Sequence, residues 1–375
     1  MSVLYLHIGT PKTGTSAIQA FLGINHNRKV LERNGFSFPL FENFKKVDDA
    51  VLVRNAHTLI VGVYGNRDDY AEDEDLRRGF WDKVKELLDS GKNVILSDES
   101  IWHICLKMDG FFEDIYKRVH DMGHELKVVV YLRRQDKMLQ SYWRYKVMIG
   151  RRHLKLSFKD YLNSGKFGYF PLDYYKHLSD IASAIGGTDK VIVRVYEPAG
   201  FYGSTIVSDF LHCLGLELTD DYESPDIVRN EGIDFACCEV KRRLNTIDFM
   251  QKSDMLRPYM VKISEKNREQ LRYQVDSLFS ASDLKEFLGR YEESNRKTAE
   301  VFMRDKDGIL FREPVKYPKK DPDKMIKEKD RLLICAEIMV QMNKEIKRLE
   351  KKLQDSERSS WKKVFRMAGR RLKGE

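Results

Sequence analysis

Two glycines, several hydroxyl side chains and one lysine gather in a short segment near the start of the chain, Gly9-Thr10-Pro11-Lys12-Thr13-Gly14-Thr15-Ser16. Glycines let backbone N–H groups approach an anion, and the lysine and hydroxyls add a charge and further donors. The two glycines stand five residues apart, as in a Walker A loop, but Walker A needs lysine directly after the second glycine, where this chain has Thr15. The segment therefore predicts a phosphate-type site with Lys12 directed at the bridging oxygen of a terminal group.

A second set of phosphate-binding side chains follows an apolar run in the middle of the chain. Arg133 and Arg134 come directly after the run 127–132, and Ser141 lies eight residues after Arg133. A guanidinium donates paired, charge-assisted hydrogen bonds to phosphate, and a hydroxyl on the following helix adds one more. Arg133 is the expected ligand, and Arg134 is the competing candidate.

Together these two sets resemble the donor site of sulfotransferases that use 3′-phosphoadenosine 5′-phosphosulfate. The resemblance covers about residues 1–245. It implies that Arg133 and Ser141 hold the 3′-phosphate of the donor, and that the 5′-phosphosulfate is held by Pro11, Lys12, Thr13, Gly14, Thr15 and Ser16. The family often has proline two residues after the arginine, where this chain has Gln135.

Two later segments resemble the bacterial, glycan-directed branch of the same family. Tyr196-Glu197 and the residues after it resemble a strand and helix of that branch, and Arg229-Asn230-Glu231-Gly232 stands where a family loop closes over the donor. Arg229 is therefore a further candidate phosphate ligand. The acceptor that this resemblance implies is a hydroxyl of a glycan or glycolipid.

Transfer of a sulfuryl group between oxygens depends mainly on positioning and charge stabilisation, by analogy with phosphoryl transfer. Lys12 is expected to stabilise the departing phosphate oxygen. The acceptor hydroxyl needs a general base. His57 is the first candidate, because glycan enzymes of this family commonly have a histidine there; Glu99 at a strand end is the second, and His103 follows it. No set of metal ligands is apparent in the sequence, so no metal is expected.

The elements that must position these residues read as alternating strands and helices. Apolar, β-branched runs predict buried strands over 3–8, 94–96, 127–132 and 191–196. Helices are predicted over 15–22, 137–147 and 205–214. Apolar strands that each precede a helix indicate an α/β, P-loop-like three-layer fold with a central parallel sheet. Ligands of such sheets bind at the carboxyl ends of the strands, where the strand order reverses.

The remainder of the chain is predicted to be helical. The predicted sulfotransferase domain spans 1–313, with a core over 1–245 and a helical part over 231–313, and a Pro- and Lys-rich linker follows over 314–323. Between 324 and 356 apolar residues recur at alternating three- and four-residue steps, which indicates a coiled coil and a homo-oligomer. The last segment, 357–375, reads as a basic amphipathic helix suited to an anionic membrane surface.

Composition narrows the class further. The 375 residues include 66 Lys and Arg against 58 Asp and Glu, a net charge of +8, which suits an anionic ligand but does not indicate nucleic acid. Five cysteines without a CxxC spacing read as reduced thiols. No signal peptide or transmembrane run is evident, so a cytoplasmic protein is expected.

The sequence thus favours transfer of a sulfuryl group from 3′-phosphoadenosine 5′-phosphosulfate to a carbohydrate hydroxyl. A nucleoside or sugar kinase of the P-loop class remains an alternative, because Asp98 after a buried strand could hold magnesium. A non-catalytic scaffold, recruited to a membrane by its coiled coil and basic tail, is the other.

Overall fold

The computed structural model describes residues 1–41, 53–64, 74–148, 154–167, 169–225, 232–251, 254–273, 275, 277–320 and 324–372, with side chains of the last helix described as far as Ser356. The five strands are β1 (Val3–His7), β2 (Phe36–Ser37), β3 (Asn93–Ser97), β4 (Glu125–Leu132) and β5 (Val191–Val195). The helices of the first 220 residues are α1 (Thr15–Gly23), α2 (Asn25–Arg33), α4 (Glu74–Asp89), α5 (Ile101–Ile104), α6 (Phe111–Asp121), α7 (Gln135–Met148), α8 (Phe158–Asn163), α9 (Tyr174–Ile185) and α10 (Ile206–Cys213). The later helices are α11 (Phe235–Leu244), α12 (Asp248–Gln251), α13 (Arg257–Glu269), α14 (Ala281–Gly289), α15 (Glu292–Phe302) and α16 (Glu328–Leu372).

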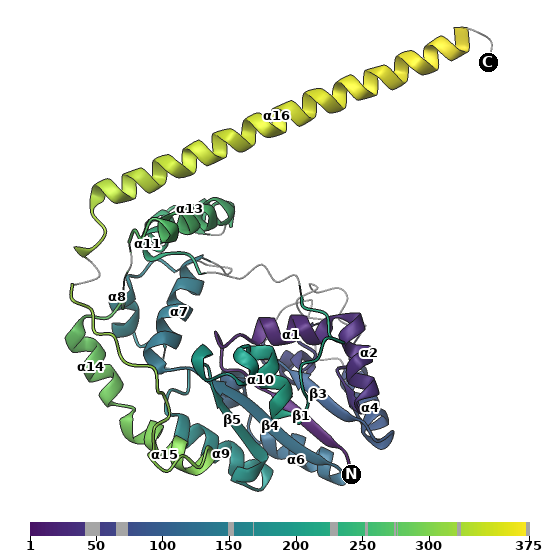
Figure 1. The fold of residues 1–375 in the computed structure, drawn as a ribbon, viewed down its shortest axis with the longest axis vertical. Coiled ribbons are helices and arrows are strands. Elements are labelled where there is room, and N and C mark those ends of the chain that lie inside the picture. The colour runs from purple at the N-terminus through teal and green to yellow at the C-terminus, as the bar shows by residue number, and fades with distance from the viewer. Residues whose placement is uncertain are drawn as a thin grey trace. The chain divides into compact units, whose positions relative to one another are not determined.

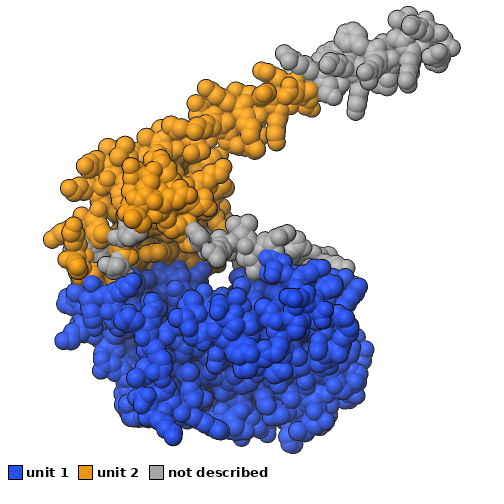
Figure 2. Space-filling model, in the orientation of Figure 1, with its two compact units in different colours: residues 1–142, 161–230, 281–317 blue, residues 143–160, 231–280, 318–375 orange. Residues whose placement is uncertain are grey.

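The chain forms two compact units, each assembled from three separate segments (Figure 2). The first unit contains residues 1–142, 161–230 and 281–317, and the second contains residues 143–160, 231–280 and 318–375. All strands of the described residues lie in the first unit. The part of the second unit that the structure describes is helical.

A five-stranded parallel sheet in the order β2-β3-β1-β4-β5 forms the centre of the first unit (Figure 1). β1 pairs with β3 on one side, with Leu6 opposite Leu96, and with β4 on the other, with Leu6 opposite Val128. The chain leaves β1 toward β2 at one edge and later crosses to β4 and β5 on the other side. The strand order therefore reverses beside β1, and a ligand site is expected at the carboxyl ends of β1 and β4.

Helices cover both faces of this sheet. One face packs on α1, α2 and α10 through a buried apolar cluster that includes Ile18, Phe21, Leu31, Phe210 and Leu211. On the other face α4 contacts β3, α6 contacts β4, and α9 contacts β5. Strands buried on both sides explain why their sequences are continuously apolar rather than alternating.

The predicted fold class is confirmed: the protein is α/β, with a central parallel sheet between helical layers. Each of the four predicted strands is present, with ends that differ by one or two residues from the prediction. The predicted helices over 15–22, 137–147 and 205–214 correspond to α1, α7 and α10. β2 was not predicted, because its two residues are too few to show a pattern.

The second unit has its own aromatic core. Trp143 packs on Phe158 and Phe235, and Phe158 packs edge-on against Phe279 at 4.9 Å. The buried amide of Asn245 donates to the carbonyls of Val147 (3.0 Å) and Leu154 (2.9 Å) and so ties α11 to the end of α7. None of the described helices is long and apolar enough to cross a membrane.

Candidate functional site

The segment Gly9–Ser16, here called the glycine loop, begins where β1 ends and is anchored to β4. The Gly9 carbonyl accepts from the amide of Tyr131 at 2.7 Å, and the Thr10 amide donates to the Tyr131 carbonyl at 2.8 Å. Thr13 is fully buried, and its hydroxyl donates back to the Thr10 carbonyl at 2.5 Å. The loop is therefore anchored to the sheet through β4.

Gly14 ends the loop and starts α1. It adopts a left-handed conformation, with φ 77°, directly before the first helical residue, Thr15. A Cβ at this position would also lie 3.1 Å from the ring of Tyr196 and 3.3 Å from Ile206, so both the conformation and the space call for glycine. The amides of the first turn of α1 point toward the loop and give it the partial positive charge of a helix N-terminus.

Arg133 connects the loop after β4 to the glycine loop. Its Nη1 donates to the Lys12 carbonyl at 2.8 Å, and its guanidinium lies 5.3 Å from the centre of the Tyr196 ring. Its own carbonyl accepts from the Tyr174 hydroxyl at 2.7 Å. The two basic segments that the sequence predicts as separate parts of one site thus touch, at the point where the strand order reverses.

Arg134 is occupied elsewhere. Its guanidinium is buried and donates to both carboxylate oxygens of Asp136, at 2.7 and 3.2 Å, and to the Glu313 carbonyl at 2.8 Å. These contacts tie Glu313 to the start of α7. The amides of Arg312 and Glu313 donate separately to the Glu197 carboxylate, which follows β5. Arg134 therefore supports the fold, whereas Arg133 is the arginine that contacts the glycine loop.

The other predicted phosphate contacts have different outcomes. Ser141 lies two helical turns after Arg133 on α7 and is partly exposed. Gln135, which stands where the family often has proline, uses its amide to reach the Leu172 carbonyl and Asn295. Arg229 lies outside the residues that the structure describes.

His57 and Asp98 form a buried pair beside the glycine loop. The Nδ1 of His57 lies 2.7 Å from Asp98 Oδ2, while Asp98 Oδ1 accepts from the Ser100 amide at 2.8 Å. Arg54 Nη1 lies 4.0 Å from Asp98 Oδ1 and 3.8 Å from Glu99 Oε1. We call Arg54, His57, Asp98 and Glu99 the acid cluster.

Contact with the glycine loop comes through Glu99. A Cβ on Gly9, which has φ 95°, would lie 3.1 Å from both the Cα and the Cβ of Glu99. Gln19 of α1 donates to Glu99 Oε2 at 3.1 Å and to the Ser97 hydroxyl at 3.2 Å. Two of the predicted catalytic residues, Lys12 and Glu99, therefore belong to loops that touch each other.

Asn55 explains why His57 reaches the end of β3 although the two are far apart in sequence. Its side-chain amide donates to the carbonyls of Pro39 and Ile95, both at 2.9 Å, and its oxygen accepts from the Ser97 amide at 2.8 Å. The Asn55 side chain thus bonds to the backbone of β3 in the way that a neighbouring strand would, and it holds the turn that contains His57 against that strand.

The carboxyls of the acid cluster have opposite pKa shifts. Burial alone raises the pKa of Asp98, but the His57 hydrogen bond, the Arg54 charge and the Ser100 amide outweigh it and hold that pKa below its ordinary value. Burial, and then the negative charge of Asp98, raises the pKa of Glu99 above its ordinary 4.5. Asp98 is therefore ionised, and its contact with Nδ1 orients the His57 ring.

The sequence predicts His57 and Glu99 as candidate bases but not the partners that position them. Its pattern offers Asp98 only as a magnesium ligand and gives no signal for Arg54 or Gln19. Both oxygens of Asp98 already accept hydrogen bonds, which is unlike a carboxylate presented to a metal. Within the described residues, no group of three or more His, Cys, Asp or Glu side chains could hold a metal ion.

His103, the third base candidate, belongs to an aromatic cluster next to this site. Its ring lies 5.7 Å from Tyr169 and 5.1 Å from Phe170, and the hydroxyls of Tyr169 and Tyr142 lie 2.6 Å apart. Burial lowers the pKa of His103 to about 4, against the charge of Asp98. The cluster therefore joins α5, which follows the acid cluster, to α7 directly after Ser141, with Tyr169 partly exposed.

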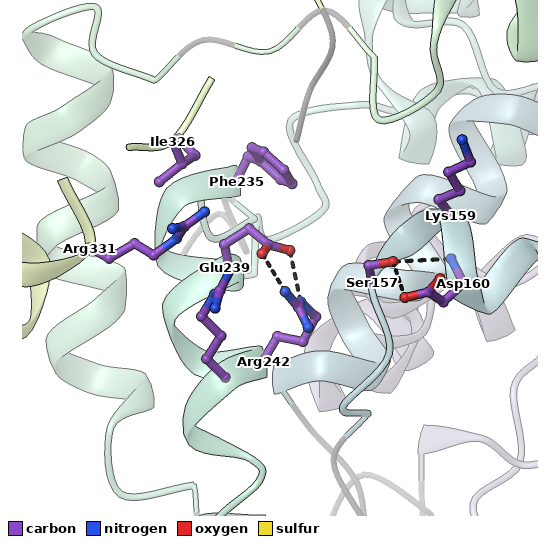
Figure 3. A pocket seen from close by; sticks show the side chains of 9 residues that line it. Ser157, Lys159, Asp160, Phe235, Glu239, Arg242, Ile326 and Arg331 are labelled. Atoms are coloured by element: carbon purple, nitrogen blue, oxygen red, sulfur yellow. Dashed lines mark hydrogen bonds and ion pairs between the residues drawn. The ribbon is translucent and has the colours of Figure 1, made fainter. Parts of the chain in front are cut away.

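A separate pocket of about 300 Å³ lies within the second unit (Figure 3). Arg242 forms a two-pronged ion pair with Glu239 at 2.7 and 2.9 Å on one wall, and Ser157 bonds to Asp160 on another. The residues that line this pocket include neither a glycine loop at a strand end nor a His–Asp pair, both of which the first unit has.

The chain is similar to known proteins both in sequence and in structure. A protein of Archaeoglobus fulgidus described as an uncharacterized protein is 27% identical over 189 residues, which is 50% of this chain and 48% of that protein. The chain thus matches about half the length of this relative. The crystal structure of a sulfotransferase from Alicyclobacillus acidocaldarius aligns with 68% of this chain and 97% of its own, at 15% identity and a TM-score of 0.36. No family model matches the chain.

Proposed function

We propose that this protein transfers a sulfuryl group from 3′-phosphoadenosine 5′-phosphosulfate to a hydroxyl of a carbohydrate acceptor. The observation that carries the proposal is the bond from Arg133 to the Lys12 carbonyl. It joins an arginine at the end of β4 to an anion-binding loop at the end of β1. A donor with phosphates at both its 3′ and 5′ positions needs two such basic groups in one site.

Each part of the glycine loop has a role in this proposal. The N-terminus of α1, with Gly14, Thr15 and Ser16, binds the 5′-phosphosulfate through amides and hydroxyls, and Pro11 and Thr13 keep the loop in shape. Lys12 lies partly exposed at the centre of the loop and stabilises the charge on the departing phosphate oxygen. Arg133 and Ser141 bind the 3′-phosphate, and Arg229 is a further candidate for it.

The acid cluster supplies the base. The acceptor oxygen attacks sulfur as the bond from sulfur to the 5′-phosphate oxygen breaks; its proton passes to His57 Nε2, and the electron pair of the broken bond stays on adenosine 3′,5′-bisphosphate. Asp98 holds the imidazole in the required orientation, in the manner of the acid in a Ser-His-Asp triad. Glu99, whose pKa is raised, is the alternative base. No step in this scheme requires a metal.

The aromatic cluster supports a carbohydrate acceptor. Tyr142 and Tyr169 present rings and hydroxyls next to Ser141, and the same cluster contains His103, four residues after Glu99. Aromatic rings with a polar edge suit the apolar faces and hydroxyls of a sugar ring. The glycan or glycolipid acceptor is proposed on this basis, together with a cytoplasmic location, which the five free thiols fit.

Binding of the product nucleotide tests the proposal directly. Calorimetry with adenosine 3′,5′-bisphosphate should show one site on the whole chain, unaffected by chelation of magnesium. Adenosine 5′-monophosphate, which lacks the 3′-phosphate, should bind at least about tenfold more weakly, since a charged hydrogen-bond pair is lost. Equal affinity for the two nucleotides, or binding only with magnesium, would exclude this donor. Transfer of labelled sulfate to a panel of glycans then identifies the acceptor.

A further inference from the structure

The helix α16 belongs to the second unit but uses only its first turns to pack there. Ile334 and Ile338 are 3% and 5% exposed, and Lys266 of α13 forms an ion pair with Glu337 at 3.0 Å. These contacts attach the first turns of α16 to α11 and α13. The helix then continues to Leu372, and Figure 1 shows it as a single long rod.

A second apolar face of α16 stays uncovered. Met339, Ile346, Leu349 and Leu353 are between 51% and 68% exposed, although they are large and apolar. With Met342 they recur at alternating steps of three and four residues, which is the spacing of a coiled-coil seam. An exposed seam of this kind indicates a partner helix with the same spacing.

We propose that this face pairs with the same face of a second copy of the chain, and that the two helices run antiparallel, with Ile346 of one opposite Leu349 of the other. Met342 then lies opposite Leu353, and Met339 opposite Ser356. The arrangement is symmetric, as expected for two identical chains. It goes beyond the proposed activity and does not depend on it.

Charges beside the seam favour this orientation. In the antiparallel register, Glu345 of each helix lies beside Lys352 of the other, which gives two attractive pairs. In a parallel pair, Glu345 of each helix would lie beside Glu350 of the other, which gives two repulsive pairs, offset only by Lys352 beside Glu357. Shifting the antiparallel register by one heptad layer in either direction places Glu345 beside Glu345, or Lys352 beside Lys352.

Space favours the same orientation. The first turns of α16 carry α11 and α13 next to the seam. In a parallel pair, the α11–α13 groups of the two chains would lie beside each other at the same level of the coiled coil. In an antiparallel pair, the two α11–α13 groups lie at opposite ends of the coiled coil. Each group then lies beside the α16 helix of the other chain and not beside the other chain's α11–α13 group.

The variant Glu345→Lys separates the two orientations. It converts two attractive pairs into two repulsive ones in the antiparallel dimer, so its dimer dissociation constant should rise about tenfold by sedimentation equilibrium of the full chain at low salt. The double variant Glu345→Lys with Lys352→Glu restores both pairs and should return to within about threefold of the original. In a parallel dimer, Glu345→Lys would create attraction to Glu350 and tighten the dimer.

Two further variants keep the test decisive. Arg348→Ala removes the same intrahelical ion pair that Glu345→Lys breaks, but lies off the seam, so it should leave dimerisation unchanged. Ile346→Glu should abolish the dimer while helix content by circular dichroism stays the same. Any of three results would overturn the proposal: an unaltered chain that is monomeric at all concentrations, a dimer dissociation constant that falls in Glu345→Lys, or a dimer that persists in Ile346→Glu.

Discussion

The Arg133 guanidinium donates to the Lys12 carbonyl at 2.8 Å, although 121 residues separate them in the chain. The bond spans the two strands at which the sheet order reverses. It uses one nitrogen of the guanidinium and fixes its plane against the Tyr196 ring. Arg133 is therefore already oriented before a ligand arrives, and binding loses little side-chain conformational entropy at this residue.

Replacement of Arg133 should weaken nucleotide binding without unfolding the protein. Arg133→Ala removes a charged donor from the 3′-phosphate, and the dissociation constant for adenosine 3′,5′-bisphosphate should rise about thirtyfold or more in calorimetry. Arg133→Lys keeps the positive charge but loses the paired donors of the guanidinium, so its dissociation constant should lie between those of the unaltered chain and Arg133→Ala. The neighbouring Arg134→Ala is the matched control: because Arg134 bonds to Asp136 and Glu313, its loss should lower the melting temperature instead.

Lys12→Ala should affect the rate more than binding. Lys12 is assigned to charge that develops in the transition state, so kcat should fall by about a hundredfold or more while the affinity for adenosine 3′,5′-bisphosphate changes by only a few fold. Single-turnover transfer of labelled sulfate measures the first quantity and calorimetry the second. An unchanged rate would remove Lys12 from the reaction.

The two candidate bases can be distinguished by their separate replacement. His57→Gln should lower kcat by about two to four orders of magnitude with donor affinity retained, and Asp98→Asn should lower it for the same reason, because an amide no longer orients the imidazole. Glu99→Gln keeps the bond from Gln19 within reach and should reduce the rate only modestly. The reverse pattern, with Glu99→Gln inactive and His57→Gln active, would assign the base to Glu99.

His177 should make the fold sensitive to mild acid. Burial lowers its pKa from 6.5 to about 4, so between these values the unfolded chain binds a proton that the folded protein does not. Stability is therefore full above pH 6.5 and falls as the pH drops toward 4, by about 1.4 kcal/mol per pH unit from this residue.

The measurement is urea unfolding at several pH values across this window. His177→Gln retains a donor for the Trp102 carbonyl but has no titrating group, so its stability should fall less steeply with pH than that of the unaltered chain. His120→Gln, at a histidine whose side chain is 70% exposed, should leave the slope unchanged. Equal slopes for all three proteins would contradict the shift.

The sequence predicts the first-unit strands well because a strand buried on both faces needs an unbroken apolar run. It does not reveal their order, which depends on contacts between residues about ninety to 120 positions apart. Lys12 and Arg133 could be predicted as phosphate ligands from the sequence because each lies in a loop that follows a predicted strand. The roles of Arg54 and Gln19 could not be predicted, because they depend on which side chains the fold brings together. Arg54 lies in an irregular turn held by Asn55, and Gln19 lies on a helix whose buried face is mostly apolar in sequence.

The central position of β1 also has a consequence for biosynthesis. Val3–His7 is synthesised before both of the strands that flank it in the sheet, Asn93–Ser97 and Glu125–Leu132. β1 lacks both of its neighbours until β3 has emerged, and one of its edges stays unpaired until β4 has emerged, at about residue 132. Folding of this sheet is then limited by non-local pairing, and the nascent N-terminal segment is the part of the chain for which we expect the greatest need of a chaperone.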